Sequence, residues 1–258
     1  MTTAYNLNDR ILILAHVPFG IQESLLYRFY DIPYEQKLLS IIGKYSSNII
    51  MCLSGHRHQD IFRVYSSMNQ TMGILGHPSI SPIGYLSQPS IRRYSYDRKS
   101  LILTDYEQYA LNLIEAERTN KDEWKISYRF SSWYHQTKSI TSESLYQLVQ
   151  LVRQDPFYLR RFLLTKHQTE QKILTTHSII QTLCALTLFN FDEFLLCTRL
   201  LEKKNIYYPS FSINNSLEMN VHLNEQLIEY KILYQRVSIC LFIVIVIICS
   251  MIYYIFCK

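Results

Sequence analysis

The stretch IIMCLSGHRHQD, residues 49–60, joins an apolar run to a loop that holds two histidines one residue apart. The run predicts a buried strand, because short apolar segments bounded by turn residues are typical of the interior of a sheet. Ser54 and Gly55 end the run, and His56 and His58 follow at once. Histidines exposed after a strand are common, so the loop alone leaves two interpretations open: a metal site or ordinary surface histidines.

A similar arrangement precedes this stretch. Residues 10–15, RILILA, predict a buried strand that stops at His16. Between the two strands, Asp31 caps a predicted helix that carries Pro33 in its first turn. The order strand, helix, strand predicts an α/β sheet, in which parallel strands end at a common edge. We therefore expect His16 and the loop of His56 to lie at the same edge.

The rest of the chain changes from the strand pattern to the helical one. Residues 60–67, DIFRVYSS, predict a third strand, and residues 90–109 predict a hairpin that turns at 97–99. Apolar residues then recur with helical spacing, which predicts four short helices over residues 141–203. Residues 207–234, with proline and several Asn and Ser, are typical of a stalk.

Composition limits the class of protein. With 258 residues, of which 48% are hydrophobic, the chain can bury one sizeable core and a second small one. The net charge of +5 arises from 26 basic and 21 acidic residues that are spread along the chain without long runs of like charge. This pattern does not indicate a nucleic-acid partner.

The C-terminal segment predicts a membrane helix. Residues 237–258, VSICLFIVIVIICSMIYYIFCK, hold no charge before the last residue, and roughly 20 apolar residues span a hydrocarbon core of ~30 Å. The alternative is a cleaved signal for a lipid anchor. The small polar cluster at 212–216 stands far from the apolar tail, with Glu225, Glu229 and Lys231 between them. A retained transmembrane helix is therefore favoured.

Different features of the sequence place the body of the protein on different sides of the membrane. Residues 1–10 lack the apolar region of a secretory signal, which taken literally predicts a tail-anchored protein facing the cytosol. Asn69 and Asn214 begin acceptor motifs for N-glycans, which matter only in the lumen or outside the cell. Such motifs also arise by chance, so both placements stay open at this point.

Of the six cysteines, only Cys184 and Cys197 look like disulfide partners. They lie on two amphipathic segments joined by a short turn, where Asn190 and Glu193 resemble a capping box. Antiparallel helices so joined can bring two thiols within bonding reach, although spacing alone does not prove a bridge. Cys52 lies inside the second strand and is expected to be a buried small hydrophobe.

These motifs together resemble a known family. Each one is weak alone, but the ordered set is similar to the C-terminal half of the acid sphingomyelinase-like phosphodiesterases, which are calcineurin-like metallophosphoesterases. The resemblance covers residues 11–201. It is carried by HVPFG (16–20), GHRHQDIF (55–62), PSISP (78–82), QPSIRRYSYD (88–97), LTDYEQYALNL (103–113) and the helical pair of Cys184 and Cys197.

The resemblance implies an α/β fold: a partial metallophosphoesterase sheet, a small helical C-terminal domain and then the single transmembrane helix. For the single-pass membrane protein predicted from the C-terminal segment, the resemblance implies a body that is extracellular or lumenal, where the acceptor motifs at Asn69 and Asn214 would carry N-glycans. The expected parts are the C-terminal half of the metallophosphoesterase domain at 1–110, the sphingomyelinase-type helical domain at 111–205, the stalk at 206–234 and the membrane helix at 235–257.

For the site, the resemblance implies two zinc ions and a phosphodiester or sphingolipid substrate. His16 and His56 correspond to ligands of one metal ion and His58 to a ligand of the other. Asp60 corresponds to an acidic residue for which we expect a supporting role behind the ligands. Phe19 stands where the family has a second proline in this loop, which departs from the pattern.

The family's remaining ligands have no counterpart here. No aspartate is followed two places on by histidine, and no asparagine directly precedes histidine. We therefore expect the chain alone to be an incomplete phosphodiesterase whose edge strand, at 11–15, is uncovered. Three hypotheses follow: part of a longer membrane-anchored enzyme, a non-enzymatic tethered remnant that binds a partner or a lipid headgroup, or a chain completed by a partner polypeptide.

Overall fold

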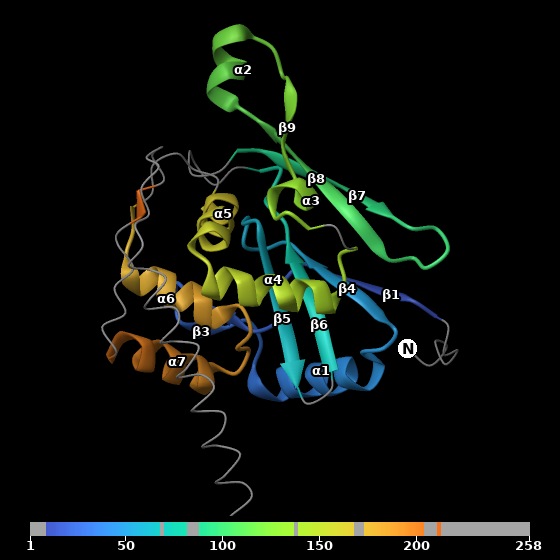
Figure 1. Ribbon diagram of the computed structural model, residues 1–258, viewed down its shortest axis with the longest axis vertical. Coiled ribbons are helices and arrows are strands. Elements are labelled where there is room, and N and C mark those ends of the chain that lie inside the picture. Colours follow the sequence, from blue (N-terminus) through green and yellow to red (C-terminus); the bar gives the residue numbers. More distant parts are fainter. Residues whose placement is uncertain are drawn as a thin grey trace, which may run out of the picture.

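A four-stranded sheet positions the histidine loops. The computed structural model describes residues 9–67, 70–81, 88–136, 139–167, 173–203 and 211–212. The sheet has the order β1-β4-β6-β5, in which β1, β4 and β6 run parallel and β5 runs antiparallel to β6 (Figure 1). Its strands are β1 (Ile11–Ala15), β4 (Ile49–Ser54), β5 (Ile61–Ser67) and β6 (Gln70–Gly76).

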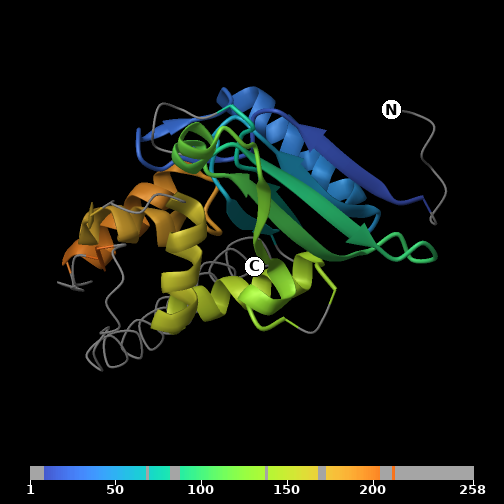
Figure 2. The ribbon, with the colours of Figure 1, turned by 90° about the horizontal axis from the view of Figure 1, so that it is seen from above.

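Helices cover both faces of this sheet. Helix α1 (Ile32–Tyr45) begins after Asp31, with Pro33 in its first turn as predicted, and lies on one face between β1 and β4 (Figure 2). Helix α4 (Ser142–Gln154) packs on β5 and β6 from the opposite face. Successive residues of β4 point to opposite faces, so Met51 joins the core under α4 and Cys52 the core under α1.

The approach of α4 to the sheet depends on a glycine. A Cβ added to Gly73 in β6 would lie 2.6 Å from the Sδ of Met51 and 2.8 Å from a methyl group of Leu145 in α4. The backbone N–H of Gly73 donates a 2.9 Å hydrogen bond to the hydroxyl of Ser142, the first residue of α4. A side chain at position 73 would therefore force Met51 and Leu145 to move, so the glycine allows the close contact of helix and strand.

A second, antiparallel sheet of three strands lies beside the first. The predicted hairpin is present, and the carboxylate of Asp97 accepts bonds from the backbone of Lys99 and Ser100 in its turn. The third strand was not predicted, and a protruding helix, none of whose residues is buried, precedes it (Figure 1). These elements are β7 (Ser90–Tyr96), β8 (Leu103–Leu111), α2 (Leu113–Thr119) and β9 (Trp124–Arg129).

The four helices predicted over 141–203 are present. Thr141 and Ser144 form a capping box at the start of α4, and apolar residues of all four helices join the larger core cluster together with strands β4 to β6. Besides α4, they are α5 (Pro156–His167), α6 (Thr176–Ala185) and α7 (Phe191–Lys203). Shorter elements are β2 (Ile21–Gln22), β3 (Tyr27–Arg28), α3 (Phe130–Trp133), β10 (Ile173–Leu174) and β11 (Phe211–Ser212).

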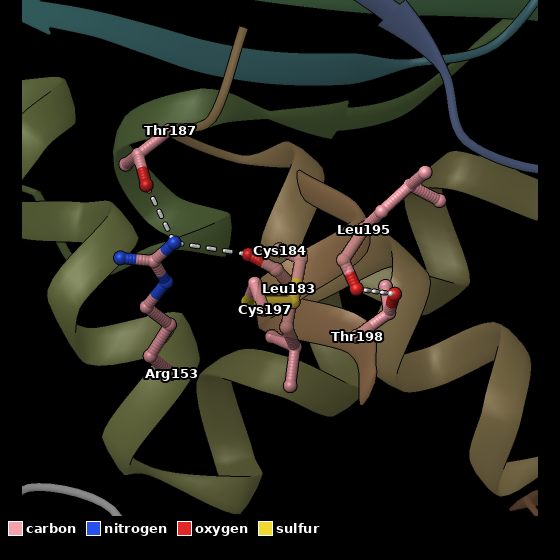
Figure 3. The surroundings of a disulfide bond; sticks show 7 residues. All are labelled: Arg153, Leu183, Cys184, Thr187, Leu195, Cys197 and Thr198. Carbon is pink, nitrogen blue, oxygen red and sulfur yellow. Dashed lines mark hydrogen bonds between the residues drawn. A yellow bond between two sulfur atoms is a disulfide. The ribbon is translucent and has the colours of Figure 1, made fainter. Parts of the chain in front are cut away.

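A disulfide joins Cys184 of α6 to Cys197 of α7, as the sequence predicted (Figure 3). The amide oxygen of Asn190 accepts from the backbone N–H groups of Asp192 and Glu193, which starts α7 directly after the turn. Beside the bridge, Arg153 of α4 donates to the carbonyl oxygen of Leu183 at 3.1 Å. The bridge therefore lies where three helices meet.

The predicted fold class needs a correction. The sheets and helices are present, but within the described ranges no helix is long and apolar enough to cross a membrane. The transmembrane part of the prediction and the single-pass membrane localisation built on it are therefore not upheld. The segment 235–257, most of the stalk, and the acceptor residues Asn69 and Asn214 lie outside the described residues.

Candidate functional site

Three parallel strands end level with one another at one edge of the sheet. Ala15 at the end of β1 pairs with Ser54 at the end of β4, and Ser54 pairs with Gly76 at the end of β6. A histidine follows each strand end directly or after one residue. The register therefore brings the predicted histidine loops together, and it adds His77, which the sequence analysis missed.

His16 and His56 meet at this edge. The Nε2 of His16 lies 3.3 Å from the Nδ1 of His56, and the two rings are nearly perpendicular. The backbone N–H of Gly55 also donates to the carbonyl oxygen of His16 at 3.0 Å, which fixes the two loops to each other. Both imidazoles are exposed, so they face solvent rather than the core.

The spacing of these nitrogens suits a metal ion. Two nitrogen ligands about 2.0–2.1 Å from a tetrahedral zinc ion are about 3.3–3.4 Å apart. The same distance suits an N–H···N hydrogen bond, so it supports metal binding only together with the rest of the site. His16 and His56 therefore fit two corners of a zinc tetrahedron.

His58 has two features that are unusual for a surface histidine. Both His56 and His58 have φ of +53°, in the left-handed region that side chains rarely adopt. The Nδ1 of His58 is buried and has no hydrogen-bond partner within the described part of the chain. Backbone strain of this kind gathers at functional sites, and a buried nitrogen without a partner is available to a ligand.

The donor set is nevertheless incomplete. Within the described residues, no group of three or more His, Cys, Asp and Glu side chains is placed to hold a metal ion. A zinc ion needs four ligands, of which three come from protein even in an open catalytic site. The described residues thus fit part of a metal centre.

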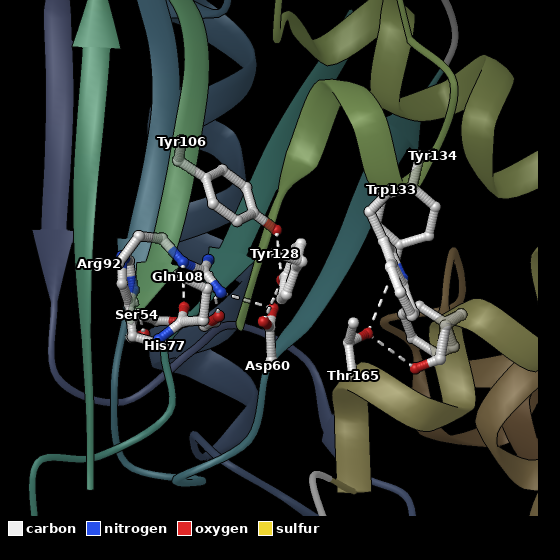
Figure 4. Close-up of polar contacts among 12 residues, drawn as sticks. Ser54, Asp60, His77, Arg92, Tyr106, Gln108, Tyr128, Trp133, Tyr134 and Thr165 are labelled. Atoms are coloured by element: carbon white, nitrogen blue, oxygen red, sulfur yellow. Dashed lines mark hydrogen bonds and ion pairs between the residues drawn. The ribbon is translucent and has the colours of Figure 1, made fainter. Parts of the chain in front are cut away.

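Asp60 supports this edge in a different way from the one expected. Its carboxylate forms a 2.6 Å ion pair with Arg92 and accepts a hydrogen bond from Tyr128, and it makes no bond to the Nδ1 of His58 (Figure 4). The guanidinium of Arg92 lies 3.9 Å from the ring centre of Tyr106 and donates to the amide oxygen of Gln108. The network joins the start of β5 to the second sheet.

His77 is held between the two sheets (Figure 4). Its Nδ1 and the carbonyl oxygen of Ser54 are 3.0 Å apart, and its Nε2 lies 2.6 Å from the hydroxyl of Tyr94. Burial and the charge of Arg92 lower the pKa of His77 to about 4, against the effect of the bond to Ser54. The imidazole is therefore neutral at pH 7, with Nδ1–H donating and Nε2 accepting.

This histidine predicts a loss of stability in weak acid. Between pH 6.5, its ordinary pKa, and the folded value of about 4, His77 is protonated in the unfolded chain but neutral in the folded chain. Stability should therefore fall by about 3 kcal/mol as the pH falls through this window. Urea unfolding measured at several pH values should show this slope in the wild type, and His77→Gln should flatten it.

Carboxyl groups also bind protons at the lower end of this pH range and change the stability there. A matched control variant is therefore needed. His135→Gln removes an exposed histidine and should keep the wild-type slope. An unchanged slope in His77→Gln would refute the assignment.

A buried charged cluster lies behind the histidine loop. Glu23 follows β2 and is 3% exposed, and three cations surround its carboxylate. Arg63 donates to it at 2.6 Å and Lys166 at 2.8 Å, and Arg57 forms a third ion pair. Burial alone would raise the pKa of Glu23, but the charges of Lys166, Arg63 and Arg57 hold it well below its usual value. The sequence analysis missed this cluster because its members are far apart in the chain.

Comparison with known proteins gives a consistent group of relatives. The model of the acid sphingomyelin phosphodiesterase C-terminal region matches residues 81–204. The chain is 32% identical over 151 residues to the cyclic GMP-AMP phosphodiesterase SMPDL3A of Homo sapiens. The aligned region covers 54% of this chain and 32% of that protein. It is 24% identical over 231 residues to the acid sphingomyelinase-like phosphodiesterase 3b of Mus musculus, and this alignment covers 85% of this chain and 50% of that protein.

A relative from another organism belongs to the same group. The sphingomyelinase phosphodiesterase C of Dictyostelium discoideum is 25% identical over 171 residues, covering 60% of this chain and 37% of that protein. The chain thus spans about a third to a half of the length of the curated relatives it matches.

Proposed function

Because the chain is related to the acid sphingomyelinase-like phosphodiesterases, as its motifs predicted, we propose that it supplies part of a two-zinc phosphodiester hydrolase site. In this proposal His16 and His56 bind one zinc ion and His58 binds the other. The observation that carries it is the 3.3 Å distance between His16 Nε2 and His56 Nδ1 at the edge where β1 and β4 end.

The chain's own residues would hold the ligands in place. Zinc binds neutral imidazoles, and when bound it supplies a nucleophile from water near neutral pH and offsets the charge of the phosphoryl oxygens. The bond between Gly55 and His16 fixes the two loops relative to each other. The network of Asp60 and Arg92 holds the strand that follows His58 against the second sheet.

We propose that the remaining ligands come from residues that lie beside β1. This strand forms one edge of the sheet, next to His16, and two of its apolar side chains are exposed, Leu12 at 43% and Leu14 at 74%. An apolar strand edge of this kind is a template for a further strand. A segment paired there would reach the metal edge, whether it belongs to a longer form of this chain or to a partner.

The substrate we propose is a phosphodiester. The name of one relative points to cyclic GMP-AMP and that of the matching family to sphingomyelin, and both compounds contain a phosphodiester bond. A two-metal site acts on that bond.

The same strand edge favours a second candidate, a binding module without turnover. The described residues place no three metal donors together, and β1 is open to a partner polypeptide. In that case the chain should bind its partner through β1 and show no phosphodiesterase activity in the resulting complex. Turnover in the complex would exclude this candidate.

Zinc titration of the 258-residue chain tests the metal site. His56→Ala removes one of the two close nitrogens and should weaken zinc binding by about tenfold or more, since even supporting groups around a metal change affinity by that much. His135→Ala, which removes an exposed histidine outside the site, should leave the affinity unchanged. Equal affinity in the wild type and His56→Ala would contradict the ligand assignment. We expect the chain alone not to hydrolyse bis(p-nitrophenyl) phosphate.

A further inference from the structure

The turn that carries the candidate ligands is strained, and a buried side chain attaches it to the rest of the protein. His56 and His58 both have φ of +53°, and Arg57 stands between them. Strained residues keep such a conformation only when their surroundings fix it. The side chain of Arg57 is 3% exposed and is paired with the carboxylate of Glu23. This charge-assisted, buried ion pair ties the turn to the segment that follows β2.

Glu23 is itself held from two other elements. Arg63 of β5 donates to Glu23 at 2.6 Å and to the carbonyl oxygen of Ile21 at 2.8 Å. Lys166, near the end of α5, donates to the other carboxylate oxygen at 2.8 Å and to the hydroxyl of Thr182 in α6 at 2.7 Å. Glu23 thus connects the histidine turn with the sheet and with the helical part of the chain.

We propose that Glu23 and Arg57 are positioning residues, which hold the turn of His56 and His58 in its strained shape and so set the orientation of both imidazoles. Through Lys166, the helical region becomes part of the support of the site. This inference rests on the proposed function only in naming metal binding as the purpose of the orientation. Both side chains are buried and paired with each other, and neither is assigned a chemical step.

The alternative is that the cluster only stabilises the fold. The chain offers a matched pair of variants that separates the two cases, because Arg57 and Arg63 both pair with Glu23 and their side chains are equally buried. Only Arg57 lies in the histidine turn, whereas Arg63 lies in β5. A purely structural cluster predicts similar effects for Arg57→Met and Arg63→Met on every measurement. A positioning role predicts that Arg57→Met changes the imidazoles far more than Arg63→Met does.

Two readouts test the proposal on the 258-residue chain. The first is the NMR chemical shifts of the imidazole nitrogens of His16, His56 and His58 without metal. The second is zinc affinity, measured with zinc alone. Arg57→Met should shift the signals of His56 and His58 and weaken zinc binding by about tenfold. Arg63→Met should change both readouts much less, because Glu23 keeps its pairs with Arg57 and Lys166, and Arg57→Lys should restore part of the loss because lysine keeps the charge.

The outcomes also separate this proposal from the one above. Unchanged imidazole signals in Arg57→Met, or equal shifts in Arg57→Met and Arg63→Met, would overturn the positioning role. If the wild type binds no zinc, the metal assignment fails, and the imidazole signals still decide whether Arg57 orients the turn. If Arg57→Met does not fold, Arg57→Lys is compared with Arg63→Lys: the imidazole signals should shift more in Arg57→Lys, and equal shifts would overturn the positioning role.

Discussion

The free energy of unfolding should drop by about 3–5 kcal/mol when Glu23 is replaced by glutamine, because breaking a buried ion pair leaves its partner charge uncompensated in the interior. Here one carboxylate serves three cations: Arg57, Arg63 and Lys166. All four side chains are at most 5% exposed. Glutamine keeps the shape and removes the charge. Urea denaturation followed by circular dichroism at pH 7 measures the effect.

Removing one cation should offset part of this loss. Burial lowers the pKa of Lys166 to about 8, although the charge of Glu23 opposes that shift, so the lysine is mostly charged at pH 7. The double variant Glu23→Gln with Lys166→Met carries one buried cation fewer and should be more stable than Glu23→Gln alone. Glu115→Gln, which breaks an exposed pair with Arg118, should be nearly neutral. If Glu23→Gln is as mild as this control, the cluster contributes little to folding.

The local pattern of the sequence predicted the frame of the site. Apolar runs ended at His16 and at Ser54, and the order strand, helix, strand placed these ends at one edge of a parallel sheet. The register of β1 and β4 confirms this juxtaposition. Such features were predictable because they depend on residues close together in the chain and on a general rule of sheet topology.

The supports of the site were not predictable in the same way. Glu23 and Lys166 are 143 residues apart, and no pattern in either neighbourhood indicates that the two side chains meet. The sequence analysis missed His77 because it did not predict β6. This strand contains two glycines, and only its pairing with neighbouring strands defines it. Asp60 stands two residues after His58 in the sequence, but its partners Arg92 and Tyr128 come from the second sheet, whose third strand was not predicted.

Replacing Asp60 by alanine should destabilise the protein by about 3–5 kcal/mol, since Arg92 would remain as a buried charge without its partner. The side chains of Asp60 and Arg92 are 3% and 1% exposed, and the ring of Tyr106 covers the guanidinium. Tyr128 would also lose the acceptor of its hydroxyl. Asp60→Asn should cost less, because the amide oxygen still accepts from Tyr128. Thermal and urea denaturation of both variants measure the difference.

A double-mutant cycle shows whether the pair itself is responsible. If the cost of Asp60→Ala is the unpaired charge of Arg92, then Asp60→Ala with Arg92→Met should be more stable than the sum of the two single losses predicts. Additive losses would instead mean that Asp60 acts through Tyr128 alone. Asp60 begins the connection from the first sheet to the second only two residues after His58. A large coupling would therefore mean that the joint between the sheets also fixes the end of the histidine loop.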